Sequence, residues 1–188
     1  MGDWSDLDFA GPEDGGSLLA ASCTINKYLR TLRASKIDTA ADRTNWDPLD
    51  MTSYTVNGKY SPSKNDITIT AGILGGEYYN EDMSYEQMLG GIGMIIGHEI
   101  THAFDNIGAG YDKNGEEANW WTDEDYAAFQ SRAEKLADWY DGFIPYDGIQ
   151  YSGKQVQREA IADLGSMKCM LNIAAQKENF DYDVFFRQ

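Results

Sequence analysis

The sequence predicts a mainly α-helical domain with a small antiparallel β-sheet, an α+β fold. Apolar residues recur at helical spacing in four segments: 18–32, 84–104, 122–140 and 155–174. Two short segments, 54–60 and 66–70, instead alternate apolar and polar residues on either side of a turn. With 188 residues, the chain is long enough to bury a core of its own.

The N-terminal part is expected to form a helix, a loop and a pair of strands. The segment from Leu18 to Leu32 carries an apolar stripe and follows the helix-breaking run Gly15-Gly16-Ser17, which indicates an amphipathic helix. The polar segment 37–53 indicates a loop. Between the two alternating segments stands Ser61-Pro62-Ser63-Lys64-Asn65, which is typical of a turn between antiparallel strands.

Three longer helices are expected to follow. Segment 84–104 is apolar on nearly all sides, so we expect it to lie at the centre of the domain despite its four glycines. Thr122, with Asp125 three residues later, resembles a capping box that starts the next helix. A last helix begins near Gln155 and should turn these residues inward: Val156, Ala160, Ile161, Leu164, Met167, Leu171 and Ala174.

The composition excludes several classes of function. Fifteen basic and thirty-one acidic residues give a net charge of −16, which repels nucleic-acid phosphates and anionic lipid. No apolar run approaches the roughly 18 to 20 residues of a membrane span, and no signal peptide is encoded, so cytoplasmic and exported or cell-surface locations both stay open. Cys23 and Cys169 are too few for a disulfide framework and are expected to be unpaired core thiols.

His98-Glu99-Ile100-Thr101-His102 is the pattern that carries chemistry. Two histidines four residues apart lie on one face of a helix, about one turn from each other, and can hold one metal ion. Zinc suits such a site and makes a bound water acidic enough to lose a proton to Glu99, the expected general base. Burying these polar groups among isoleucines would be costly without a cation.

A zinc site of this kind needs a third protein ligand. The run Glu159-Ala160-Ile161-Ala162-Asp163 sets two carboxylates one helical turn apart in an apolar stretch. Glu159 is the expected third ligand, and Asp163 can accept the outer N–H of a ligand histidine. The sequence therefore predicts one Zn²⁺ per chain, bound by His98, His102 and Glu159.

Further motifs accompany these two. They are Val56-Asn57-Gly58-Lys59-Tyr60, Ala71-Gly72-Ile73-Leu74, Gly90-Gly91-Ile92-Gly93, His98 to Asp105, and Asn119-Trp120-Trp121-Thr122. With them the chain resembles the neprilysin-like (M13) zinc metallopeptidases, clearly over residues 42–171. The two cysteines favour a bacterial member of the PepO type, because the animal members need many more.

The resemblance implies a thermolysin-like zincin core built on the HExxH and ExxxD helices. It agrees with the three ligands and the base given above and adds a proton-donating role for Asp163. It also implies that Asp105, like Asp163, contacts a ligand histidine rather than the metal. Asn57 and the backbone of Gly58 are expected to bind the main chain of an oligopeptide substrate by β-augmentation along an edge strand.

The resemblance further implies a partial catalytic domain. Residues 1–41 would form an N-terminal helix and loops, 42–171 the zinc-site core, and 172–188 a truncated C-terminal segment. The family has a helical lobe over the site, and a downstream histidine and arginine that serve the oxyanion and the substrate; we expect all of these outside this chain. Three positions depart from the family: Gly58 stands where alanine is usual, and Arg158 and Ala160 flank the ligand glutamate where glycine and asparagine are usual.

Two functions from different classes stay open. An intact Glu99 favours a zinc endopeptidase that hydrolyses oligopeptides. The absence of an oxyanion histidine from the chain favours a zinc domain that binds peptides without cleaving them. A third possibility, a helical module without metal, requires the HExxH pattern to be accidental.

Overall fold

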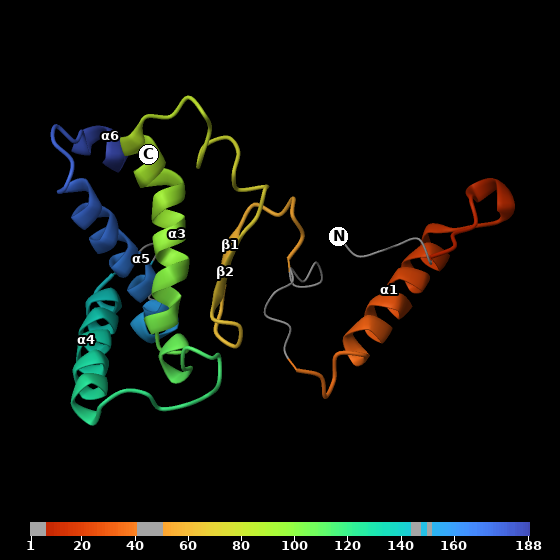
Figure 1. The fold of residues 1–188 in the computed structure, drawn as a ribbon, viewed down its shortest axis with the longest axis horizontal. Coiled ribbons are helices and arrows are strands. Elements are labelled where there is room, and N and C mark those ends of the chain that lie inside the picture. The colour runs from red at the N-terminus through yellow and green to blue at the C-terminus, as the bar shows by residue number, and fades with distance from the viewer. Residues whose placement is uncertain (1–6, 41–50, 144–147, 150–151) are drawn as a thin grey trace. The chain divides into compact units, whose positions relative to one another are not determined.

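The computed structural model describes four stretches of the chain: 7–40, 51–143, 148–149 and 152–188. The chain forms two compact units, Met1–Ser53 and Tyr54–Gln188. The described residues are mainly helical and contain one two-stranded antiparallel sheet, which confirms the predicted fold class (Figure 1). Within these stretches, no helix has both the length and the hydropathy of a membrane span.

The first unit holds one long helix. α1 spans Leu18–Ala34 and follows a short 3-10 turn, η1, at Pro12–Asp14. Ser17 caps α1, since its Oγ accepts a 3.1 Å hydrogen bond from the backbone N–H of Ala20. The predicted helix is confirmed, but α1 has no buried residue, so its apolar stripe stays accessible in the part of the unit that is described.

A hairpin of two strands forms the sheet of the second unit: β1 (Gly58–Ser61) and β2 (Asp66–Ile69). The first residue of β1 pairs with the last residue of β2, and Asn65 closes the turn with a φ of 49°, which asparagine adopts readily. The predicted strand pair is confirmed. β1 begins later than expected. Thr70 holds the segment before it: its hydroxyl contacts the backbone oxygens of Thr55 and Asn57, and its backbone N–H also donates to the backbone oxygen of Asn57.

The predicted helix 84–104 is continuous but changes its winding. It consists of α2 (Tyr85–Met88), the π-helical η2 (Leu89–Gly93), α3 (Met94–Thr101) and the 3-10 turn η3 (His102–Phe104). Ser84 and Gln87 start it with the reciprocal hydrogen bonds of a capping box. Gly90 and Gly91 lie in the π turn, where a Cβ on either would meet the backbone carbonyl of another segment.

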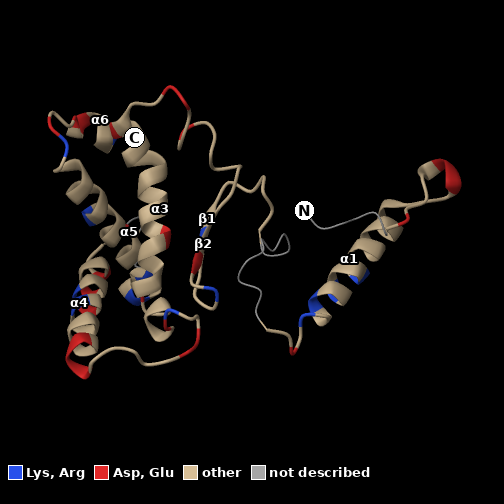
Figure 2. Ribbon diagram, viewed as in Figure 1, with Lys and Arg blue, Asp and Glu red and all other residues tan. Residues whose placement is uncertain are grey.

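Two long helices pack beside this segment. α4 (Asp123–Asp141) lies against α5 (Gly153–Ala174), and α5 lies against α3 (Figure 1). Thr122 caps α4 as predicted, and acidic residues fill the first turn of α4, where the helix dipole favours them (Figure 2). The short elements η4 (Gly108–Gly110) and α6 (Tyr182–Arg187) complete the unit.

The core cluster of the second unit joins α5, α6 and the π turn: Leu89, Met170, Ala174, Phe180 and Phe185. Leu164 was expected to face inward but is 58% exposed, because Ala162 and Ser166 occupy the buried face of α5 on either side of it. The expectation of core thiols was also wrong, since Cys23 and Cys169 are both exposed. Cys23 lies on α1, which buries nothing, and Cys169 lies on the solvent side of α5.

Candidate metal centre

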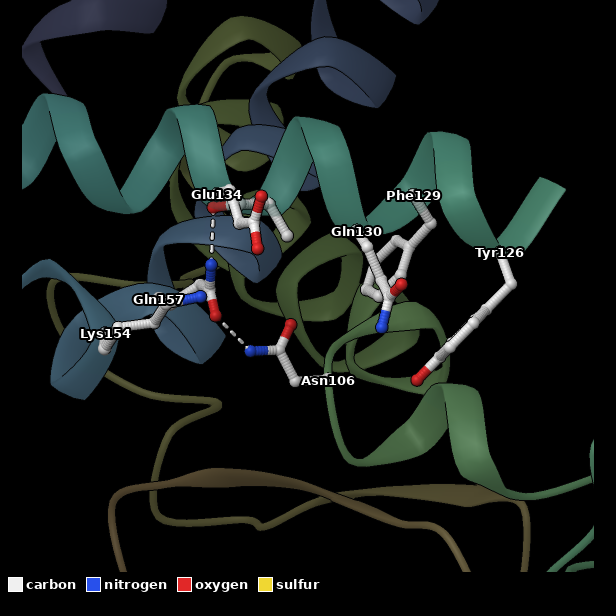
Figure 3. Close-up of a pocket in the computed structure, with 8 residues that line it drawn as sticks. Asn106, Tyr126, Phe129, Gln130, Glu134, Lys154 and Gln157 are labelled. Atoms are coloured by element: carbon white, nitrogen blue, oxygen red, sulfur yellow. Dashed lines mark hydrogen bonds between the residues drawn. The ribbon is translucent and has the colours of Figure 1, made fainter. Parts of the chain in front are cut away.

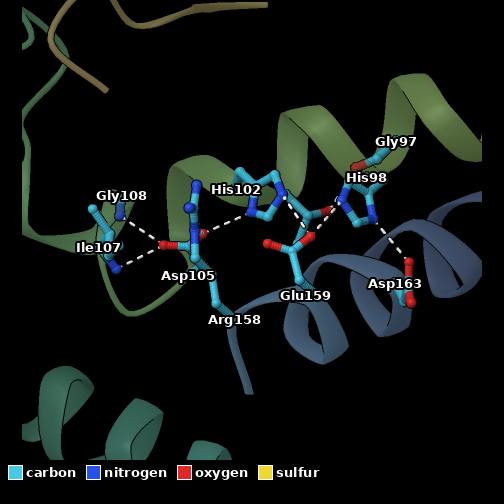
Figure 4. Close-up of polar contacts among 10 residues, drawn as sticks. Gly97, His98, His102, Asp105, Ile107, Gly108, Arg158, Glu159 and Asp163 are labelled. Atoms are coloured by element: carbon cyan, nitrogen blue, oxygen red, sulfur yellow. Dashed lines mark hydrogen bonds and ion pairs between the residues drawn. The ribbon is translucent and has the colours of Figure 1, made fainter. Parts of the chain in front are cut away.

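Two histidines and one glutamate converge from different helices. His98 lies on α3 and His102 begins η3 one turn later, with ring centroids 4.5 Å apart. Glu159, on α5, points between them: its Oε2 lies 3.2 Å from Nε2 of His98 and 3.5 Å from Nε2 of His102 (Figure 4). One ligand atom from each residue lies within 4.8 Å of the other two. The structure thus brings together the three residues that the sequence indicated as ligands.

A carboxylate forms a hydrogen bond with Nδ1 of each imidazole, the ring nitrogen that faces away from Glu159. Oδ1 of Asp163 lies 2.8 Å from Nδ1 of His98, and Oδ2 of Asp105 lies 2.7 Å from Nδ1 of His102. An ionised carboxylate can only accept a hydrogen bond, so each Nδ1 carries the proton in the neutral rings. Each Nε2 then turns its lone pair toward Glu159.

This set of donors fits a zinc ion. Two imidazole lone pairs and one carboxylate oxygen face one another, an arrangement that repels itself unless a proton or a cation lies between them. Zinc takes nitrogen and oxygen ligands of this kind in a tetrahedral shell. Three protein ligands leave the fourth position for water or substrate.

Asp105 is fully buried and accepts four hydrogen bonds. Its Oδ1 accepts the backbone N–H groups of Ile107 at 2.7 Å and Gly108 at 2.8 Å, and its Oδ2 accepts from His102 and from Nε of Arg158 at 2.6 Å. Burial raises the pKa of the carboxyl, but these hydrogen bonds outweigh burial and lower the pKa to about 2. Asp105 therefore remains ionised beside the imidazole.

The pKa of His102 is raised for a related reason. Burial of the imidazole lowers the pKa, whereas the hydrogen bond to Asp105 and the negative charge of Glu159 raise it, and the net shift is upward. A position that attracts a proton in this way also attracts a metal cation.

Glu99 is buried between α3 and β1. A Cβ added to Gly58 would lie 3.0 Å from both Cγ and Oε1 of Glu99, so the strand passes directly beside this carboxylate. Asn57 precedes β1 and is exposed, and its backbone oxygen accepts a 2.8 Å hydrogen bond from the buried hydroxyl of Thr70. The structure thus sets the expected base next to the strand that is expected to bind substrate.

The three converging side chains differ in exposure. The side chain of His102 is 6% exposed and that of His98 is 21% exposed, whereas that of Glu159 is 58% exposed. The histidines are anchored in the body of the unit, and water reaches the site from the Glu159 side.

A set of contacts on α5, just before the ligand glutamate, was not predicted from the sequence. Arg158 donates to Asp105 (Figure 4). The buried Gln157 accepts from Nδ2 of Asn106 and donates to a backbone carbonyl of α4 (Figure 3). The signal in the sequence was Arg158 itself, a basic residue at a position where the resembling family usually has glycine.

Comparison with known proteins relates these residues to a family. Residues 57–185 match the model of Peptidase family M13. The neutral endopeptidase of Lactococcus lactis subsp. cremoris is 36% identical over 173 residues, which cover 92% of this chain and 27% of the relative. The neutral endopeptidase of Lactobacillus helveticus is 44% identical over 130 residues, which cover 69% of this chain and 20% of the relative.

Solved structures show the same likeness. PepO from Lactobacillus rhamnosis HN001 (DR20) matches with a TM-score of 0.85 and 34% identity, over 97% of this chain and 28% of that one. The zinc metalloprotease Zmp1 of Mycobacterium tuberculosis, in complex with an inhibitor, matches with a TM-score of 0.74 and 32% identity. The match covers 86% of this chain and 25% of that one. The chain spans about a quarter of the length of these proteins, and over that span both its sequence and its fold show that it belongs to peptidase family M13.

Proposed function

We propose that the protein containing this chain is a zinc-dependent endopeptidase that hydrolyses peptide bonds of oligopeptides. The observation that carries the proposal is the convergence of His98, His102 and Glu159 close to the buried Glu99, which follows His98 on α3. Membership of a peptidase family supports it, as do relatives described as neutral endopeptidases and a zinc metalloprotease.

In this proposal His98, His102 and Glu159 hold one Zn²⁺ per chain. When bound, zinc polarises the substrate carbonyl and lowers the pKa of a water molecule to about 7. Asp163 and Asp105 keep the two imidazoles in the tautomer that presents Nε2 to the metal, and their hydrogen bonds make those nitrogens more basic.

Glu99 is the proposed general base. It accepts a proton from the water that attacks the peptide carbonyl and then delivers that proton to the amine nitrogen as the carbon–nitrogen bond breaks. Its burial beside β1 keeps the carboxylate close to a peptide lying on that strand. Asp163 orients His98, and the part in proton donation that the resemblance implies would use a proton that its exposed carboxylate takes up from solvent.

The substrate main chain is proposed to lie along β1. In the described part of the chain the sheet consists of β1 and β2, and the substrate would add to it beside β1 as a further strand. Asn57, exposed just before β1, and the backbone of Gly58 would bind that strand. This mode recognises the peptide backbone, as oligopeptide substrates of varied sequence require.

A second candidate is a zinc-containing chain that binds peptides without turnover. The exposure of Glu159 and of Asp163, whose side chain is 68% exposed, favours it, because the described residues do not shield the site from water. The chain has two histidines and both face the proposed metal, so neither can donate a hydrogen bond to an oxyanion.

Peptide cleavage by the parent protein and by the 188-residue chain, each with zinc and with a chelator, distinguishes the two candidates. The endopeptidase proposal expects cleavage by the parent that the chelator abolishes. Cleavage that persists in the chelator would exclude it. Zinc-dependent peptide binding without cleavage by either protein would support the second candidate.

A further inference from the structure

Two consecutive residues of the loop after η3 form hydrogen bonds with two consecutive residues of α5. Nε of Arg158 lies 2.6 Å from Oδ2 of Asp105, and Nδ2 of Asn106 donates to Oε1 of Gln157 (Figures 3 and 4). We call these four residues the clasp. It joins the segment that carries His102 to the helix that carries the ligand glutamate.

The clasp is anchored on both sides. In the loop, Oδ1 of Asp105 accepts the backbone N–H groups of Ile107 and Gly108. On α5, Gln157 is 3% exposed and also donates to the backbone carbonyl of Ala133 in α4. A shift of α5 against the loop would therefore break hydrogen bonds of buried groups, which is costly.

Glu159 depends on the position of α5 because its own side chain is more than half exposed. Beyond it along the helix, Asp163 contacts His98, and Oγ of Ser166 donates to the backbone oxygen of Met94 on α3. Those contacts fix α5 on one side of Glu159, and the clasp fixes it on the other.

We propose that Arg158 is a positioning residue for the metal site, acting through Asp105 on His102 and through α5 on Glu159. Nε of Arg158 donates to Oδ2 of Asp105, the same oxygen that accepts from Nδ1 of His102. Arg158 thus fixes the acceptor that aims the imidazole. The inference rests on the proposed zinc site.

The positive charge of Arg158 would lower zinc affinity, whereas its positioning role would raise it. A guanidinium near a metal dication weakens binding by repulsion. Here the guanidinium is paired with Asp105, and the Arg158 side chain is 37% exposed, so its field at the ligands is largely cancelled and screened. Loss of Arg158 should therefore lower zinc affinity if positioning dominates and raise it if charge dominates.

Two variants separate these effects. Arg158→Gln keeps a nitrogen donor at the place of Nε but loses the charge, and Arg158→Met has a similar length with neither donor nor charge. Zinc affinity of the 188-residue chain is measured by competition with a chromophoric chelator, and the visible spectrum of the Co²⁺-loaded chain reports the ligand geometry. We expect Arg158→Met to bind zinc on the order of tenfold more weakly with a changed cobalt spectrum, which is the lower end of the loss typical for an outer partner of a ligand, because Arg158 acts through that partner, Asp105. Arg158→Gln should stay close to the unmodified chain in both readouts.

Equal or tighter zinc binding by Arg158→Met overturns the inference, and so does an equal loss in both variants. Melting curves without metal show whether each variant folds. If Arg158→Met does not fold, Arg158→Ala takes its place, because it removes the donor and the charge of this partly exposed side chain and adds no new group, and unchanged zinc affinity there overturns the inference.

The same titrations separate this inference from the proposed function. If the unmodified chain binds no zinc, both fail. If it binds zinc and Glu159→Ala weakens binding while Arg158→Met does not, the positioning role fails and the zinc site stands.

Discussion

Nδ1 of His98 lies 2.8 Å from Oδ1 of Asp163, although 65 positions separate the two residues in the sequence. Together with the bond between His102 and Asp105, this contact leaves both Nε2 atoms facing Glu159. The protein itself holds these five side chains in one arrangement. Metal binding at this point should therefore stabilise the folded chain.

Zinc is expected to raise the melting temperature of the 188-residue chain. A ligand that binds only the folded state stabilises it by about 2.7 kcal/mol at a concentration 100 times its Kd. Calorimetric melts with zinc and with chelator measure the effect, and elemental analysis after dialysis should find one zinc per chain. Glu159→Ala should lose the stabilisation, whereas Glu178→Ala, at an exposed position outside the site, should keep it. Identical melts with and without zinc would count against the site.

The ligand set could be predicted from the sequence because its geometry is local. His98 and His102 are one helical turn apart, as are Glu159 and Asp163, and the period of the α-helix fixes which side chains share a face. Contact between the two helices could also be predicted, because a zinc site with two histidines needs a third protein ligand. The helix starts at Ser17 and Thr122 were predictable for the same local reason.

The contacts that could not be predicted depend on tertiary packing. The bond between Arg158 and Asp105 exists only because the loop after η3 lies against α5. Leu164 fits the apolar period of its helix, but the close approach of α3 and α5 selects small residues for the shared face and leaves the leucine outside. The period alone does not distinguish these two faces.

Gly97→Ala should destabilise the fold and weaken zinc binding. A Cβ at Gly97, the residue before His98, would lie 2.5 Å from Oγ and 3.3 Å from Cα of Ser166 on α5. Forcing the helices apart should cost roughly 1 to 3 kcal/mol, as overpacking does. Gly75→Ala is the matched control, because a Cβ there meets nothing within 4 Å. Urea unfolding of the metal-free variants measures the difference, and equal stability would show that the helix contact tolerates the methyl group.

Asp105 should make the metal-free chain lose stability in acid. Folding lowers the pKa of this carboxyl from 3.8 to about 2, so its contribution is fully present above its unfolded pKa and is lost as the pH falls through about 2. The contribution is on the order of 2 kcal/mol, since one pKa unit corresponds to about 1.4 kcal/mol. Urea unfolding of the chain and of Asp105→Asn should show a stability difference that shrinks between about pH 4 and pH 2. A difference independent of pH would contradict this assignment.

The 188-residue chain alone should cleave peptides poorly. Loss of one oxyanion donor typically lowers the rate by about 10² to 10³, and neither histidine of this chain is available as that donor. The comparison is between the zinc-loaded chain and the parent protein, with a bradykinin-sized peptide. Comparable turnover by the chain alone would mean that a donor lies within these residues.

Glu99→Gln in the parent protein tests the central claim most directly, through zinc content and kcat measured on the same preparation. The three ligands are untouched, so zinc content should equal that of the unmodified protein. Glutamine cannot accept the proton of the attacking water, so kcat should fall by at least about 10²-fold. Near-normal turnover with zinc in place would show that another group accepts the proton, and would contradict the assignment of Glu99 as the general base.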